Sequence, residues 1–293
     1  MGFSVNTNVG AMAALQSLSA TNKGLETTQS RINTGLEVSS TKDDSAKYVI
    51  AQTLRGSLGK LSAVNSSLNN AKSVTDTAIA GAEQISDLVN QMKSKALEAS
   101  DTGLDVESRT AISKDLLSLK AQIGTIVEGS DFNGTNLLKG TAATVATDGK
   151  VSALQSIATG ATALTVGNQA FTEKATAAYG DSATDTAITG LADADSATGA
   201  AAAKTLSDNL DTFFSAVKTS LSELGSASRK IEGQISFTSK LSDVVESGIG
   251  NLVDADLAKE SAKLQALQVK QQLGLQALSI ANQAPQSIMS LFR

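Results

Sequence analysis

The sequence predicts a mainly α-helical protein: an elongated antiparallel helical bundle with terminal coiled-coil helices and a small β-containing central insert. Three observations predict this fold class. The 293 residues include a single proline, Pro285, so almost nothing interrupts a helix from within. Only 3% of the residues are aromatic, and much of the apolar content is alanine, the strongest helix former. Apolar residues also recur every seven positions along several segments, as they do in coiled coils.

Residues 1–40 carry one such series among serine, threonine, glutamine and asparagine. Its members are Ala11, Leu18, Leu25 and Ile32. Residues 44–100 carry two series with the same period, offset by three positions. Their members are Leu54, Leu61, Leu68, Thr75, Ala82, Val89 and Ala96, and Val64, Ala71, Ala78, Ile85, Met92 and Ala99. A seam sustained over about six heptads predicts one long helix that packs against partner helices.

Asp43 and Asp44 lie directly before this long helix. Two acidic side chains together can form a catalytic or metal-binding pair, or they can cap a helix. Adjacent side chains point apart on a helix, and no third ligand type is nearby. We therefore predict that Asp43 and Asp44 cap the helix, whose free N–H groups and dipole favour a carboxylate at this end.

Two further helices are expected near residues 105–128 and 205–247. The first has apolar residues at spacings of four and three, with Asp105 as its N-cap and Gly129 as its stop. The second has a seven-residue series that only Thr238 interrupts: Leu210, Val217, Leu224, Ile231 and Val245. Residues 139–203 lack this periodicity. There we predict a strand at Ala163–Val166 and turns at Asn133-Gly134, just before this segment, and at Asp148-Gly149.

The last segment, residues 251–293, has two apolar faces on a helical wheel of 100° per residue. One face holds Val253, Leu257, Leu264, Leu267, Leu275 and Leu278; the opposite face holds Ala262, Ala266, Val269, Leu273, Ala277, Ile280 and Ala284. A glutamine and serine flank separates them on one side. Two opposed faces need partners on both sides, so we predict burial against other chains. A dimer and a polymer both satisfy this requirement.

The composition excludes several classes of function. Cysteine and histidine are absent, which removes disulfides, thiolate nucleophiles, imidazole bases and nearly all zinc, copper and haem sites. We therefore predict no catalytic, cofactor-binding or metal-binding residues; a serine–lysine or paired-carboxylate enzyme is the alternative. A net charge of −5 disfavours nucleic acid as a partner. No signal peptide and no membrane span are visible, which taken alone predicts a cytoplasmic protein without a membrane partner.

Five motifs, in order, resemble those of bacterial flagellins. They are Val5-Asn6-Thr7-Asn8, Arg31-Ile32-Asn33-Thr34-Gly35, Lys42-Asp43-Asp44-Ser45-Ala46, Phe132-Asn133-Gly134-Thr135-Asn136-Leu137-Leu138, and Ala277–Gln286, which reads ALSIANQAPQ. The resemblance covers roughly residues 1–140 and 205–293. It implies a structural subunit that polymerises into the flagellar filament for swimming motility. The alternative within the same superfamily is the hook–filament junction protein.

The resemblance also implies a division into domains. Residues 1–40 and 251–293 would form the terminal coiled coil of the inner filament core, residues 41–140 and 204–250 a helical shell, and residues 141–203 a short exposed variable insert. The expected polymerisation interface comprises Ala11, Leu18, Leu25, Ile32, Leu257, Leu264, Leu267, Val269, Leu273, Leu275, Leu278 and Ile280. The serine- and threonine-rich insert is open to two interpretations, O-glycosylation or simple solubility.

The resemblance reverses the predicted compartment, because flagellins leave the cell through the flagellar export apparatus without a cleaved signal peptide. The expected location is thus extracellular. The implied partners are further copies of the chain or other flagellins, the export apparatus, a chaperone for the C-terminal helix, and the filament cap and hook-associated proteins. A Toll-like receptor recognises a shell-helix motif that here is replaced in part by Lys93, Ser94 and Lys95, so weak or no receptor activation is expected.

Overall fold

The computed structural model describes residues 8–140, 149–158, 160–180, 185–193 and 195–291, with the side chains from residue 284 onward left out. The predictions at Val5–Thr7 and Asp148 therefore lie outside the described residues. The elements, in chain order, are α1 (Val9–Thr34), α2 (Ser45–Ala99), α3 (Val106–Gly129), β1 (Asp131–Phe132), β2 (Thr135–Asn136), β3 (Val151–Ala153), β4 (Leu164–Val166), α4 (Phe171–Tyr179), α5 (Thr186–Thr189), the 3-10 helix η1 (Gly190–Ala192), α6 (Ser196–Val253) and α7 (Leu257–Leu291). The mainly α class with a small β-containing insert is confirmed.

The chain divides into two compact units. One comprises the residues up to Leu58 together with those from Asp243 onward, and the other comprises Gly59–Ser242. α2 and α6 contribute residues to both units. The first unit holds the two chain ends, and the second holds the main hydrophobic core.

In the larger unit, α2 and α6 run antiparallel in a constant register. Asn65 Nδ2 lies 3.3 Å from Ser239 Oγ, Lys72 Nζ lies 2.9 Å from Glu232 Oε1, and Ser228 Oγ donates to Asp76 Oδ1 over 3.1 Å. Lys93 and Asp211 form the next ion pair along the two helices. The predicted seam is the core: of its α2 members only Leu54, in the other unit, is half-buried, and all the rest are buried.

The α3 helix packs on this core and confirms the predicted N-cap. The Asp105 side chain accepts a hydrogen bond from the Ser108 N–H. The predicted stop is wrong by one residue, because Gly129 is still helical and Ser130 is the C-cap, with its N–H bonded to Ile126 O. α6 is also longer than predicted at both ends, since it begins at Ser196 and reaches Val253. Alanines at 200–203 extend its start, and helical Gly248 and Gly250 fail to stop it.

The predicted strand in the central segment and the predicted Asn133-Gly134 turn just before it are both present. β4 pairs antiparallel with β3, and β1 pairs with β2 across the Asn133-Gly134 turn, where both residues have positive φ. The helices α4 and α5 were not predicted. Phe171 and Tyr179 of α4 meet Phe213 of α6 edge-on, with ring centroids 6.3 and 6.1 Å apart. This segment therefore contributes large buried side chains to the core.

Arg109 of α3 is fully buried and ties three parts of the larger unit together. Its Nε donates to Ala99 O over 3.1 Å, its Nη2 to Asp101 O over 2.7 Å, and its Nη1 to Ser196 Oγ over 3.0 Å. The two carbonyls belong to the end of α2 and the turn after it. A cation at a helix C-terminus is favoured by the helix dipole and satisfies carbonyls that lack a helical partner.

Candidate assembly interface

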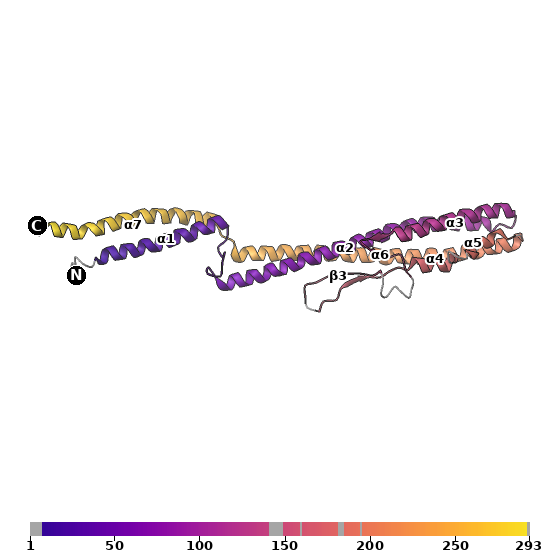
Figure 1. Ribbon diagram of the computed structural model, residues 1–293, viewed down its shortest axis with the longest axis horizontal. Helices are drawn as coiled ribbons and strands as arrows, with labels where there is room; N and C mark the ends of the chain where they lie inside the picture. The colour runs from indigo at the N-terminus through magenta and orange to yellow at the C-terminus, as the bar shows by residue number, and fades with distance from the viewer. Residues whose placement is uncertain (1–7, 141–148, 159, 181–184, 194, 292–293) are drawn as a thin grey trace. The chain divides into compact units, whose positions relative to one another are not determined.

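The terminal helices α1 and α7 lie side by side in the smaller unit (Figure 1). Gly35 ends α1 in the left-handed conformation, with φ 71°. The chain then forms a bridge with the α6–α7 junction: Glu37 N–H donates to Val253 O over 2.7 Å, and Ala255 N–H donates to Gly35 O over 2.9 Å. A small core of Val38, Ala51 and Val253 covers this bridge. The Asp256 carboxylate accepts from the N–H groups of Ala258 and Lys259 and starts α7.

The α1–α7 contact is a heptad seam of small and apolar side chains. The half-buried or buried positions are Ala11, Ala14, Leu18, Thr21, Gly24, Leu25, Thr28, Arg31 and Ile32 of α1, and Glu260, Leu264, Leu267, Gln271, Gly274, Leu278 and Ala281 of α7. Glycines lie at two places of this contact, and only Gly274 is closer to the facing helix than an ordinary Cβ contact would be. A Cβ at Gly274 would lie 3.3 Å from Leu18, and one at Gly24 would lie 3.5 Å from Leu267. All four predicted α1 residues therefore lie within an intramolecular seam.

The predicted α7 residues divide between two faces. Leu264, Leu267 and Leu278 are half-buried in the seam, whereas Leu257, Val269, Leu273, Leu275 and Ile280 are exposed, Ile280 by 68%. The helical wheel groups Leu257 and Leu275 with Leu264. The seam positions of α7 advance by alternating steps of three and four, and a 100° wheel drifts by about 20° per heptad against such a repeat, so it misplaces Leu275. Leu257 lies one heptad before Leu264 but is the first residue of α7, and it is exposed.

Three apolar residues of α1 are exposed as well. Val9, Met12 and Leu15 are 75%, 66% and 57% exposed, at successive steps of three along one side of the helix. They line a shallow groove with Ala20 and Lys23. Sequence reasoning missed these residues because only the seven-residue series was followed, and the spacing of three was the available signal. We call Val9, Met12, Leu15, Leu257, Val269, Leu273, Leu275 and Ile280 the outward apolar surface.

Polar bridges cross the α1–α7 seam at three places. Asn8 Nδ2 donates to Ala281 O over 2.8 Å, Gln271 Nε2 donates to Asn22 Oδ1 over 2.8 Å, and Arg31 Nη1 lies 3.1 Å from Glu260 Oε1. Burial of Glu260 would raise the pKa of its carboxyl, but the hydrogen bond from Arg31 and the charge of Lys263 outweigh burial and lower this pKa. Sequence reasoning missed all three bridges, because each joins residues more than 200 positions apart.

The two aspartates before α2 have different surroundings. Asp44 Oδ1 accepts from the N–H groups of Ala46 and Lys47, each over 3.0 Å, at the start of the helix. Asp43 Oδ2 instead accepts from the N–H and hydroxyl groups of Ser39 and Ser40 in the preceding loop. The hydroxyl of Ser39 and the N–H of Ser40 lower the pKa of the Asp43 carboxyl. The Asp44 carboxylate thus binds N–H groups in the first turn of α2, whereas the Asp43 carboxylate binds N–H groups of the loop before this helix.

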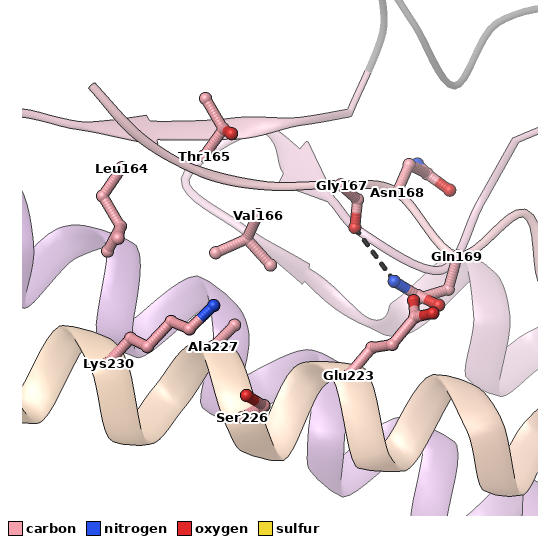
Figure 2. Close-up of a pocket in the computed structure, with 10 residues that line it drawn as sticks. All are labelled: Leu164, Thr165, Val166, Gly167, Asn168, Gln169, Glu223, Ser226, Ala227 and Lys230. Carbon is pink, nitrogen blue, oxygen red and sulfur yellow. Dashed lines mark hydrogen bonds between the residues drawn. The ribbon is translucent and has the colours of Figure 1, made fainter. Parts of the chain in front are cut away.

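Within the described residues, no group of three or more acidic, histidine or cysteine side chains could hold a metal ion. In the same residues, every helix is too short or too polar to span a membrane. A cavity of about 360 Å³ lies between the β3–β4 hairpin and α6 (Figure 2). It is lined by Leu164–Gln169 and by Glu223, Ser226, Ala227 and Lys230, and Gln169 donates to Gly167 O over 3.2 Å.

Comparisons with known proteins agree with the motifs at both chain ends. Residues 5–143 match the bacterial flagellin N-terminal helical region, and residues 207–292 match the bacterial flagellin C-terminal helical region. The chain is 43% identical to the flagellin FljM of Caulobacter vibrioides over 99% of this chain and 98% of the relative. It is 38% identical to a flagellin of Brucella melitensis over 99% of each chain.

Each of these relatives is named a flagellin, and each match covers nearly the full length of this chain and of the relative. Flagellins are structural components of the extracellular bacterial flagellum and assemble with themselves. These matches favour the filament subunit over the hook–filament junction protein and over an enzyme. The chain belongs to the bacterial flagellin family and is a structural subunit of the flagellar filament.

Proposed function

We propose that the outward apolar surface is where neighbouring copies of the chain bind α1 and α7 in the filament. The observation that supports this most directly is the division of the predicted interface. Seven of its residues meet within one chain, while Leu257, Val269, Leu273, Leu275 and Ile280 remain exposed on α7. Exposed apolar side chains concentrated on one element mark an interaction surface. The seam residues act indirectly, because they hold the pair that presents this surface.

The proposed domain roles follow from this assignment. Residues 1–40 and 251–293 supply the inner core, 41–140 and 204–250 the helical shell, and 141–203 the insert on the solvent side. The compact units support the separation of chain ends from shell, although their boundaries, at Leu58 and Asp243, lie further into α2 and α6. Asp43 and Asp44 shape the turn between core and shell by holding its loop and the first turn of α2.

Export without a cleaved signal peptide, through the flagellar export apparatus, completes the proposal. The outward apolar surface gives a physical reason for a cytosolic chaperone on the C-terminal helix, since unassembled copies would aggregate through it. The filament cap and the hook-associated proteins would contact the same chain ends of the subunit, residues 1–40 and 251–293.

We also propose that this flagellin activates a Toll-like receptor weakly or not at all. Lys93 takes the place of an arginine, pairs with Asp211 and lies 4.8 Å from the centre of the Phe214 ring. These contacts leave the ammonium group partly satisfied within the chain. Purified monomer should give a weak response in a receptor reporter-cell assay, and a robust response would contradict this.

The assembly proposal is tested by charge on the two sides of α7. Val269→Asp, Leu273→Asp and Ile280→Asp together should abolish filaments seen by electron microscopy, because neighbouring copies would have to bury three carboxylates. The matched control places the same charges at Gln268, Gln272 and Ser279, exposed polar residues of the same helix. Filaments from the first variant, or equal loss in both, would contradict the assignment of the surface.

A further inference from the structure

Pro285, the chain's single proline, lies within α7 rather than at its end. Proline has no N–H group, so it cannot donate to the carbonyl four residues earlier in the helix, which belongs to Ala281. A carbonyl without a donor in a half-buried position is unfavourable, and such groups are nearly always paired in native proteins. The proline therefore creates a hydrogen-bond vacancy at a defined position of α7.

The α1 helix fills this vacancy with its N-cap residue. Asn8 Nδ2 donates to Ala281 O over 2.8 Å, while Asn8 Oδ1 accepts from Ala11 N–H over 3.1 Å. One amide thus satisfies two groups that the helices themselves leave unpaired: an N–H at the start of α1 and the Ala281 carbonyl.

The apolar seam specifies the register of α1 on α7 only weakly. Alanine, leucine and threonine recur along α1 at seven-residue intervals, so a shift by one heptad would bring similar side chains together. After a shift by one heptad, the Ala281 carbonyl would face either a side chain that has no hydrogen-bond donor or no side chain at all. A single polar residue can fix the register of a coiled coil in this way.

We propose that Asn8 and Pro285 form a register lock for the terminal helix pair. Pro285 frees the Ala281 carbonyl, and Asn8 is the positioning residue that pairs with it only in the native register. The lock rests on the proposed role of this pair in assembly, because the register decides which residues of α1 and α7 form the outward apolar surface. The partner is another segment of the same chain, and the effect on neighbouring copies is indirect.

The lock predicts that the effect of losing the Asn8 donor depends on residue 285. Asn8→Ser keeps a good N-cap but shortens the side chain so that it cannot reach Ala281. In the otherwise unchanged chain, this change should raise the monomer concentration in equilibrium with filaments about fivefold, the ratio given by one ordinary hydrogen bond. With Pro285→Ala, residue 285 regains its N–H, the Ala281 carbonyl is satisfied within α7, and the increase should fall below about twofold.

Gln271→Ala supplies the matched control, since it removes the Gln271–Asn22 bridge without touching residue 281. Its effect should be the same with proline or alanine at 285. Equal effects of Asn8→Ser in both backgrounds, or none in either, would overturn the lock. Hydrogen exchange of residues 9–20 in the soluble full-length variants gives a readout that needs no assembly. If the lock appears there while the charged surface variants still polymerise, only the proposed assembly surface is wrong.

Discussion

The two units of the chain use the same seven-residue repeat with different results. In the larger unit, the α2 and α6 series are buried, because α3 and the central segment cover what two helices leave open. In the smaller unit, the α1–α7 seam is mostly half-buried, and apolar residues remain on the outward sides of both helices. A heptad repeat therefore predicts helix pairing, but the number of layers around a pair decides whether its burial is complete within one chain.

The largest expected effect is a loss of stability that distinguishes residues buried in the core from an exposed residue of the outward apolar surface. Leu68→Ala and Ile85→Ala each remove a fully buried side chain and should lower the free energy of unfolding of the larger unit by about 2–5 kcal/mol. Val269→Ala should change the stability of the monomer by less than about 0.5 kcal/mol, because the side chain is exposed. Denaturant unfolding of the soluble chain measures both, and equal losses would remove the distinction between the units.

A slightly smaller effect is expected at the buried arginine. Arg109→Met keeps the bulk but leaves the Ala99 and Asp101 carbonyls without their donors, so the larger unit should lose about 2–4 kcal/mol. Arg109→Lys keeps the charge and loses the forked geometry, and its loss should be intermediate. A Met variant as stable as the original chain would show that these hydrogen bonds add nothing to stability.

The helix caps should contribute about 1 kcal/mol each, in both units. Asp105→Ala removes the acceptor of Ser108 N–H in the larger unit, and Asp44→Ala removes the acceptor of two N–H groups in the smaller one. Circular dichroism melting should show the first loss in the main transition. The second should appear as faster hydrogen exchange over the first turn of α2, and unchanged exchange there would argue against capping by Asp44.

The smallest effect concerns pH and the Arg31–Glu260 bridge. The folded-state pKa of Glu260 lies below its ordinary value of 4.5, so the carboxylate stabilises the α1–α7 pair above that pH. This contribution is lost as pH falls through the lowered pKa, and for a partly exposed pair it is under about 1 kcal/mol. Glu260→Gln should flatten the acid dependence of α1 hydrogen exchange below pH 4.5, whereas an unchanged profile would show that another group titrates.

Much of the fold could be predicted from periodicity alone, because the members of the seven-residue series in α2 and α6 are buried throughout the larger unit. The N-cap at Asp105 and the turn at Asn133-Gly134 were also predictable, since each depends on local hydrogen bonds and backbone angles. The packing of Phe171 and Tyr179 was not, because α4 is too short to show a period. Arg109 binds the Ser196 hydroxyl and Asn8 binds the Ala281 carbonyl; each partner is distant in sequence, and no local pattern marks such partners.

The central claim is that the larger unit is complete within one chain, whereas α1 and α7 complete their burial against other copies. Hydrogen exchange of the full-length protein, compared between soluble monomer and filament, tests this most directly. We predict that amides of α1 and α7 become much more protected on assembly, while buried segments of α2 and α6 around Leu68 and Ile231 are already protected in the monomer. Equal protection of α1 and α7 in both states would contradict the account.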